Sequence, residues 1–206
     1  MRVAIVGGTG AFGLALAARL VEVGDEVVIG SRDAERAEEK AREVGALAGT
    51  TNQEAVRDVD LVVLSTNADA TLVTAAELAD SNGETPLLSV ASELHFDSGR
   101  ALPGADSSSL AERTQKLVRG SVAAGLHSLA AGKLAHRRPD EDAFICGDHE
   151  PAKALSLELA GKVVAGRALD VGPLASARAL EGMTAVIVNL NKRYKGHAGV
   201  RITGLP

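Results

Sequence analysis

The sequence has few aromatic side chains and almost no cysteine. Of its 206 residues only 2% are aromatic, tryptophan is absent, and the formal net charge is −5. Nucleic-acid binding needs a basic surface and rings on which bases stack, so this composition argues against a nucleic-acid partner. The single cysteine, Cys146, excludes an internal disulfide, which is typical of a reducing compartment. We therefore expect a cytoplasmic protein.

Long apolar runs and common catalytic motifs are also missing. No apolar stretch approaches the roughly 18 residues of a membrane span, and glycines interrupt the N-terminal apolar stretch too early for a signal peptide. None of the five histidines has metal-ligand spacing, and no G-x-S-x-G nucleophile motif occurs. We therefore expect no membrane partner, no metal, and chemistry that asks little of acid–base side chains.

The most specific pattern lies in the first part of the chain. Residues 2–6 form a short β-branched run, and residues 14–21 carry apolar side chains at helical spacing. Between them, Gly8, Gly10 and Gly13 match the G-x-G-x-x-G spacing of a dinucleotide-binding turn. There Gly8 permits the bend, Gly10 lets a pyrophosphate approach, and Gly13 lets the helix pack closely. The pattern predicts phosphates bound at a helix N-terminus; a purely structural turn is the alternative.

The end of the second predicted strand, residues 27–29, indicates which dinucleotide binds. An NAD site usually has Asp or Glu here for the ribose 2′-hydroxyl, whereas this chain has Gly30-Ser31-Arg32. Ser31 offers a hydroxyl, Arg32 offers a planar cation, and Arg36 shares its helix face. With no carboxylate to repel a 2′-phosphate, the pattern predicts NADP. For Arg36 alone, pairing with neighbouring glutamates is the alternative.

Alternating apolar runs and helical patterns predict an α/β fold. We expect a Rossmann-type, doubly wound, mostly parallel sheet with a small C-terminal helical extension. Further strands are predicted at 60–65, 86–90, 119–126, 143–147 and 163–171, and helices at 34–44, 70–78, 151–160 and 175–191. Another helix is expected to begin within 107–112, where Ser109 and Glu112 have capping-box spacing. Residues 96–103 are expected to form a loop. Residues 1–120 would form the NADP-binding core, and residues 121–206 would extend the sheet and contribute an acceptor pocket.

Ligands of such sheets bind outside the carboxyl ends of the strands. Ser65 and His127 each end a predicted strand, so both are expected to face the crevice beside the glycine turn. His127 is the candidate for contact with an acceptor, and a hydrogen-bonded structural histidine is the alternative. Hydride transfer between two bound cofactors needs two rings held face to face more than it needs acid–base groups. The missing catalytic motifs therefore favour this reaction.

The chain resembles the NADPH-dependent reductases of the deazaflavin coenzyme F420, the F420:NADP oxidoreductases. The resemblance covers nearly the full length. Its most specific pieces are Gly7-Gly8-Thr9-Gly10, Gly30-Ser31-Arg32 with Arg36, Leu126-His127, Cys146-Gly147-Asp148 and the run 170–178. It implies an oligomeric enzyme that exchanges hydride between NADPH and F420. Where the family has prolines and a tryptophan at the deazaflavin pocket, this chain has Thr66-Asn67-Ala68, which predicts a pocket of different shape.

The resemblance also implies roles for individual residues. Thr9, with Ser31, Arg32 and Arg36, would hold the 2′-phosphate region of NADP. His127 and the backbone of Leu129 would contact the deazaflavin ring, and Ala198 would border that pocket. The expected cofactor-binding residues are Gly8, Thr9, Gly10, Phe12, Gly13, Ser31, Arg32, Arg36, Ser65, Leu129 and Ala198, with His127 as the catalytic candidate.

Two other functions fit the same residues: an NADPH-dependent reductase of another small acceptor, such as a flavin or an imine, and a non-catalytic NADPH-binding sensor. The helix at 175–191 carries more apolar positions than one core-facing stripe requires. An excess apolar face usually seeks a partner, so we expect a homo-oligomer and specifically a dimer. Burial of this helix within its own subunit is the alternative.

Overall fold

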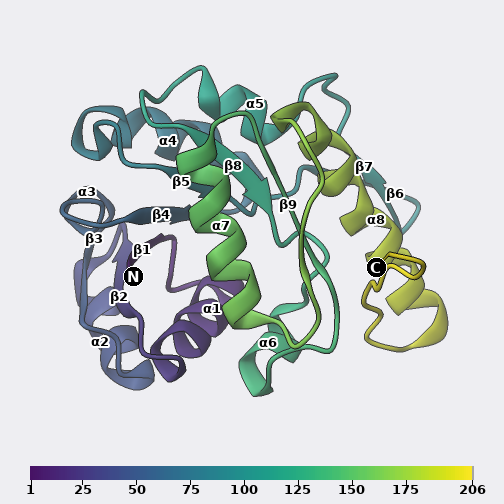
Figure 1. The fold of residues 1–206 in the computed structure, drawn as a ribbon, viewed down its shortest axis with the longest axis horizontal. Helices are drawn as coiled ribbons and strands as arrows, with labels where there is room; N and C mark the ends of the chain where they lie inside the picture. Colours follow the sequence, from purple (N-terminus) through teal and green to yellow (C-terminus); the bar gives the residue numbers. More distant parts are fainter. Residues whose placement is uncertain (206) are drawn as a thin grey trace.

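The computed structural model describes residues 1–205 and contains an eight-stranded sheet covered by helices on both faces (Figure 1). The strands, in sheet order, are β10 (Ala168–Asp170), β9 (Ala143–Gly147), β8 (Val122–Gly125), β5 (Leu87–Ser89), β4 (Leu61–Leu64), β1 (Arg2–Val6), β2 (Glu26–Ser31) and β3 (Ala48–Thr51). Neighbouring strands are parallel except β8 and β9, which are antiparallel. The predicted fold class is confirmed.

The helices divide the apolar core into two layers, one on each face of the sheet. They are α1 (Ala11–Glu22), α2 (Ala34–Val44), α3 (Asn52–Ala55), α4 (Ala68–Asn82), α5 (Leu110–Gln115), α6 (Ala131–His136), α7 (Glu150–Val163) and α8 (Ala177–Tyr194). Side chains of α1, α2, α6 and α7 pack on one face, and those of α3, α4, α5 and the start of α8 pack on the other. Strands buried on both faces explain the near-continuous apolar runs in the sequence.

Local signals fix several helix ends where the sequence analysis expected them. The Asp33 side chain accepts a hydrogen bond from Arg36 N at the start of α2, and Gly45 ends that helix in a left-handed conformation. Ser109 and Glu112 form the predicted capping box of α5. Among residues 1–205, no helix is long and apolar enough to cross a membrane.

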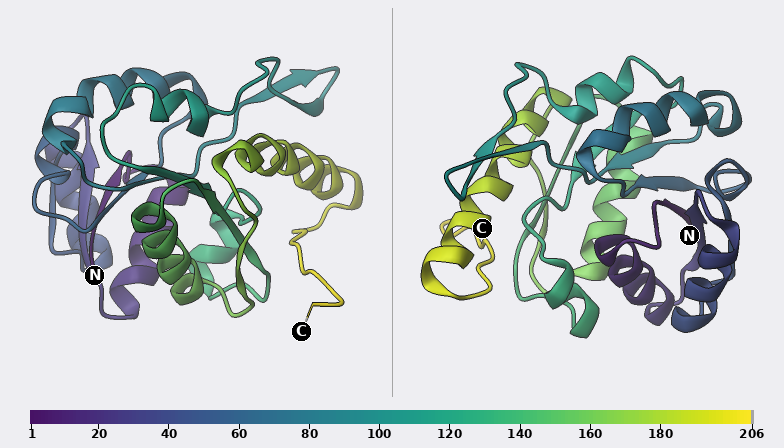
Figure 2. Two further views of the ribbon diagram at one scale, coloured as in Figure 1. Left: turned by 45° about the horizontal axis from the view of Figure 1, so that its top comes forward. Right: turned by 180° about the vertical axis from the view of Figure 1, so that it is seen from behind.

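The segment 96–103 is not the expected loop. It belongs to a hairpin of β6 (Leu94–Asp97) and β7 (Arg100–Pro103), which lies along α8 (Figure 2). The Asn189 side chain of α8 accepts from Ala101 N at 2.9 Å and donates to Ala101 O at 2.7 Å, so the helix supplies the hydrogen bonds that a further strand would give. The prediction was wrong because the partner of this short hairpin lies far along the chain.

Three short elements, β3, α3 and α6, were not predicted, and the last strand begins later than expected. Residues 48–51 contain no apolar β-branched run, so β3 has no strand signal of its own. Val163 ends α7 rather than starting β10. All these differences lie outside the β1–α1–β2–α2 unit, which carries the glycine turn and both arginines of the site described next, but that site also includes Asn52 of the unpredicted α3.

Candidate functional site

The glycine turn joins β1 directly to α1. Gly7, at φ +73°, has the left-handed backbone that favours glycine, rather than Gly8 as expected. Gly8 donates from its N–H to Ile5 O at 3.1 Å and Gly30 O at 3.0 Å. A Cβ on Gly8 would lie 2.7 Å from Ile5 O, so this glycine is needed for close packing against the strands.

The other two glycines bring α1 close to the turn. A Cβ on Gly13 would lie 2.8 Å from Gly8 Cα, so the first turn of the helix rests directly on the loop. Gly10 has an extended backbone, at φ −74° and ψ 161°, which any residue can adopt. Gly10 lines the adjoining cavity, so its missing side chain leaves room there without a backbone requirement.

The N-terminus of α1 has free hydrogen-bond donors. Its N-cap residue, Gly10, provides no side-chain cap, and the first turn contains no acidic residue. The N–H groups of Ala11, Phe12 and Gly13 have no hydrogen-bond partner among residues 1–205. A helix start of this kind carries partial positive charge and binds anions, with phosphate the usual case.

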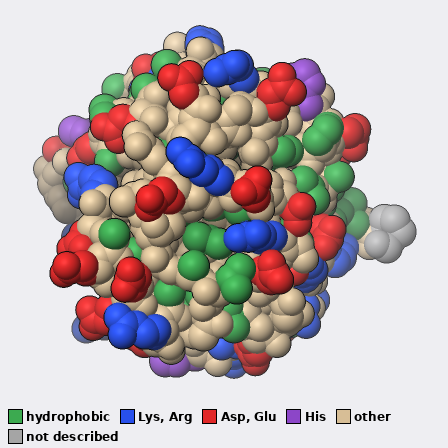
Figure 3. All heavy atoms as spheres, turned by 90° about the vertical axis from the view of Figure 1, so that its left-hand side faces the viewer, with side chains coloured by type: hydrophobic (Ala, Val, Ile, Leu, Met, Phe, Trp, Pro, Cys, Tyr) green, Lys and Arg blue, Asp and Glu red, His purple; other side chains and the backbone are tan. Residues whose placement is uncertain are grey.

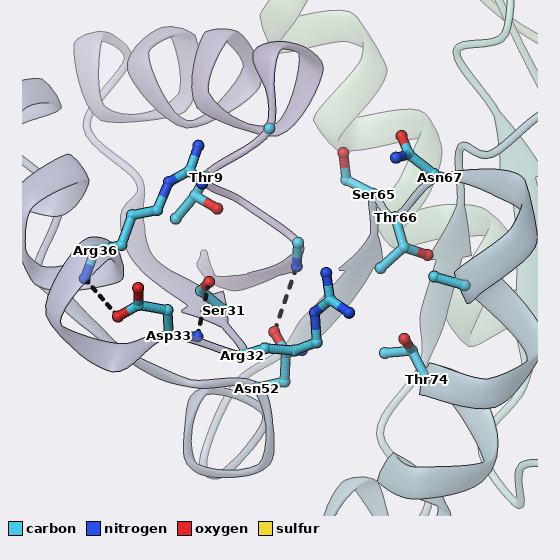
Figure 4. A pocket seen from close by; sticks show the side chains of 13 residues that line it. Thr9, Ser31, Arg32, Asp33, Arg36, Asn52, Ser65, Thr66, Asn67 and Thr74 are labelled. Carbon is cyan, nitrogen blue, oxygen red and sulfur yellow. Dashed lines mark hydrogen bonds between the residues drawn. The ribbon is translucent and has the colours of Figure 1, made fainter.

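A cavity of about 350 Å³ opens beside this turn, at the carboxyl ends of β1, β2 and β4 (Figure 4). Its lining comprises Gly7, Thr9, Gly10, Ser31, Arg32, Asp33, Arg36, Asn52, Ser65, Thr66, Asn67, Ala70 and Thr74. The structure thus brings together six of the expected binding residues: Thr9, Gly10, Ser31, Arg32, Arg36 and Ser65. They come from three separate β–α connections, as expected for a ligand site in a parallel sheet.

Two arginines line the cavity from different directions. The Arg36 side chain extends toward Thr9, while Arg32 extends across the cavity toward the Thr66 wall (Figure 4). Ser31 Oγ accepts from Asp33 N at 3.2 Å and holds the bend between β2 and α2. A phosphate placed here would meet cationic donors from more than one side.

The cavity contains one carboxylate that the sequence analysis did not expect. Asp33 lies on its wall, but its Oδ1 accepts from Arg36 N at 3.1 Å and caps α2. The wall opposite is polar: Thr66 Oγ1 and Thr71 Oγ1 are 3.1 Å apart, and Thr71 Oγ1 donates to Asn67 O. The sequence could have indicated Thr66 and Asn67, because both directly follow a predicted strand, where ligands of parallel sheets bind. Asn52 had no such signal, because it follows the unpredicted β3.

Six expected residues do not line this cavity: Gly8, Phe12, Gly13, His127, Leu129 and Ala198. Phe12 packs against the core beneath α1. Leu129 is buried, and its N–H donates to Leu126 O at 3.0 Å, so this backbone donor is already occupied. The Ala198 N–H donates to the side chain of Asn191 on α8. Gly8 and Gly13 contribute through packing of the turn.

His127 follows β8, whose parallel pairing with β5 places it at the same sheet edge as the glycine turn. The preceding Leu126 has a left-handed backbone, at φ +63°. The His127 side chain is 7% exposed, and neither ring nitrogen has a hydrogen-bond partner among residues 1–205. Burial lowers the pKa of His127 from 6.5 to about 4, so the imidazole is neutral at physiological pH.

The buried, neutral His127 predicts a pH dependence of stability. As pH falls from about 6.5 toward 4, the unfolded chain gains a proton on this residue while the folded chain does not, so the native state loses stability. We expect His127→Gln to remove about 2 to 3 kcal/mol of this loss between pH 7 and 4.5, measured by urea unfolding.

A buried carboxyl provides the control for this measurement. Burial raises the pKa of Glu181 to about 7, so its protonation stabilises the folded chain as pH falls. The Glu181→Gln variant should therefore change the slope of the unfolding free energy against pH in the direction opposite to His127→Gln. If the unfolding free energy of His127→Gln depended on pH as in the wild type, His127 would have the same pKa in the folded and unfolded chains.

The open helix N-terminus, the two arginines on the cavity wall and the parallel-sheet edge define a dinucleotide-binding α/β protein. Residues 2–93 match the family described as NADP oxidoreductase, coenzyme F420-dependent. Over 100% of its length the chain is 36% identical to the F420-dependent NADP reductase of Methanothermobacter thermautotrophicus, of which the match covers 96%. It is 32% identical to that of Methanocaldococcus jannaschii, covering 100% and 99% of the two chains.

A solved structure from Arthrobacter sp. FB24, provisionally assigned as an F420-dependent NADP reductase, shares the fold. Its TM-score is 0.86 at 23% identity, with 99% of this chain and 100% of that chain covered. The chain belongs to the family of F420-dependent NADP reductases. The resemblance found in the sequence is therefore confirmed.

Proposed function

We propose that this protein is an oxidoreductase that transfers hydride between NADPH and coenzyme F420. The observation that carries the proposal is full-length similarity to F420-dependent NADP reductases, combined with a cation-lined cavity beside an open helix N-terminus. The residues present fit NADP: the free amides of α1 suit the pyrophosphate, and Ser31, Arg32 and Arg36 suit the 2′-phosphate. The nicotinamide and deazaflavin rings would supply the hydride chemistry, and the protein would hold them in contact.

We propose a division of labour along the chain. Residues 1–120 would bind NADP, and residues 121–206 would contribute the acceptor pocket around His127. Thr9 and Arg36 lie on one side of the cavity and Arg32 crosses it, which supports a 2′-phosphate held between the two arginines (Figure 4). Leu129 and Ala198 would border the acceptor pocket through packing, since both of their N–H groups are already bonded.

Turnover with defined acceptors tests the proposal. NADPH is mixed with F420, with FMN and with a cyclic imine, and loss of the deazaflavin absorbance band reports reduction of F420. Turnover with F420 supports the proposed reaction. Turnover with the flavin or imine alone would favour a reductase of another acceptor, and tight NADPH binding with no turnover would favour a sensor.

Removing either arginine should lower the affinity for NADP+ and not the affinity for NAD+. A charged hydrogen bond contributes about 1.5–3 kcal/mol, so Arg32→Ala and Arg36→Ala should each weaken NADP+ binding by about ten- to hundredfold and leave NAD+ almost unchanged. Isothermal calorimetry measures both. Lys40→Ala is the matched control, because Lys40 lies on α2, pairs with Glu43 and does not line the cavity. Equal losses for both dinucleotides would contradict a 2′-phosphate role.

His127 should affect the acceptor and not NADPH. A neutral imidazole N–H can stabilise negative charge that grows on an acceptor ring, and one such donor is worth about 2.7–4 kcal/mol. We expect His127→Ala to lower F420 turnover by about ten- to a thousandfold with an unchanged NADPH dissociation constant. The exposed His95, on the hairpin, gives the control variant. Wild-type turnover in His127→Ala would assign His127 a structural role.

We propose a homodimer formed through α8. Val186, Leu190 and Tyr194 are 57%, 41% and 71% exposed, and their spacing places them on one helix face with Met183. The α8–hairpin unit extends away from the sheet (Figure 2), and the hairpin exposes Phe96 as well. A second copy of the same helix would cover this apolar stripe.

Charged substitutions on α8 should dissociate the dimer. Val186→Lys combined with Leu190→Lys would place two charges in the proposed contact, so we expect the mass measured by light scattering to fall by half at micromolar concentration. Val73→Lys is the control, because Val73 is 61% exposed on α4, away from this stripe. A wild-type protein of monomeric mass would overturn the proposal.

We also propose a cytoplasmic location and a small molecule as the redox partner. The one cysteine, Cys146, is free and buried, which suits a reducing compartment. Acidic and basic side chains are interspersed on the face shown in Figure 3, unlike the continuous basic surface of a nucleic-acid-binding protein.

A further inference from the structure

Asn52 lies where the ends of β1, β2 and β3 meet. It is the first residue of α3, and its side chain lines the cavity beneath the glycine turn (Figure 4). Its Oδ1 accepts a hydrogen bond from Gly7 N at 3.4 Å. A Cβ on Gly30 would lie 2.9 Å from this Oδ1, so the glycine at the end of β2 leaves the space that the Asn52 amide occupies.

Two contacts therefore hold the first half of the glycine turn. Asn52 Oδ1 holds the N–H of Gly7, and Gly30 O holds the N–H of Gly8 at 3.0 Å. Neither amide is then available to a phosphate, which leaves that task to the free N–H groups at the start of α1. Asn52 thus fixes the position of the turn relative to the end of β2, where the residues proposed to bind the 2′-phosphate begin with Ser31.

The nitrogen of the Asn52 amide, Nδ2, is free to bind a ligand, because it donates to no protein group among residues 1–205. It belongs to a side chain on the cavity wall that also carries Arg32. A primary amide has two N–H donors, and ribose oxygens accept such bonds. The amide is also uncharged, so it leaves the guanidinium of Arg32 unpaired and available for phosphate.

We propose that Asn52 is a positioning and specificity residue of the dinucleotide site. Its Oδ1 fixes the glycine turn, its Nδ2 donates to a ribose oxygen of the adenosine half, and its neutrality preserves the preference for NADP over NAD. This inference rests on the proposed function, because it assumes that the cavity binds NADP.

Two variants separate the parts of this role. Asn52→Ala removes both contacts and should weaken NADP+ and NAD+ alike, by about tenfold, because both dinucleotides share the adenosine ribose. Asn52→Asp keeps an acceptor for Gly7 N but adds a carboxylate beside Arg32 and the 2′-phosphate. It should weaken NADP+ by about tenfold more than NAD+.

Calorimetry with NADP+, NAD+ and adenosine 2′,5′-bisphosphate measures these affinities, and thermal unfolding checks the fold. The exposed neighbour Gln53→Ala is the matched control and should bind all three ligands like wild type. Hydrogen exchange of the Gly7 amide should speed up in Asn52→Ala and stay slow in Asn52→Asp. If Asn52→Ala fails to fold, the relative losses of NADP+ and NAD+ affinity in Asn52→Asp test the proposal on their own.

Wild-type affinity in a folded Asn52→Ala, or equal losses of NADP+ and NAD+ in Asn52→Asp, would overturn the inference. These failures differ from failure of the proposed function. A wild-type protein that binds no NADP+ would overturn both. A wild-type protein that binds NADP+ and reduces F420, with Asn52 variants that bind as well as it does, would overturn only the role of Asn52.

Discussion

The site depends on the parallel pairing of β1 with β2 and β4. This pairing places three carboxyl ends at one edge of the sheet, and the chain must leave each of them through a polar connection. The glycine turn can follow β1 without a spacer only because Gly8 and Gly13 lack side chains: a Cβ on either would lie within 2.8 Å of a backbone atom. Close packing of α1 on β1 in turn aims its free N–H groups at the cavity.

The antiparallel pairing of β8 and β9 reverses the strand direction for β9 and β10, and the C-terminal half has its own anchors. Asp142 is fully buried at the start of β9, where it accepts from Arg167 N and from Ile202 N at 2.9 and 2.8 Å. The guanidinium of Arg167 holds the pKa of Asp142 well below its usual range. The C-terminal segment is thereby tied to the sheet, and α8 packs against the β6–β7 hairpin.

Much of the cavity beside the glycine turn could be predicted because its signals are local. The glycine spacing, the residues after β2 and the caps of α2 all lie within 45 consecutive residues, and each has a physical reason that holds before tertiary contacts form. The β6–β7 hairpin could not be predicted, because the Asn189 amide that completes its hydrogen bonding comes 88 residues after Ala101. Asn52 was missed for the same reason. Its contacts with Gly7 and Gly30 exist only in the folded chain, so the sequence gives no local signal for them.

Two buried reactive groups, His127 and Cys146, favour positioning over acid–base chemistry. Burial lowers the pKa of His127 to about 4 and raises the pKa of Cys146 to about 12, so neither carries charge at neutral pH. A neutral imidazole can still donate one hydrogen bond, and a buried neutral thiol is unreactive. Hydride transfer itself needs no protein group that changes its protonation state, so fixed donors and neutral walls around the acceptor, such as His127, are sufficient for it. The same walls would serve poorly for a hydrolase, which needs a base that can accept a proton near pH 7.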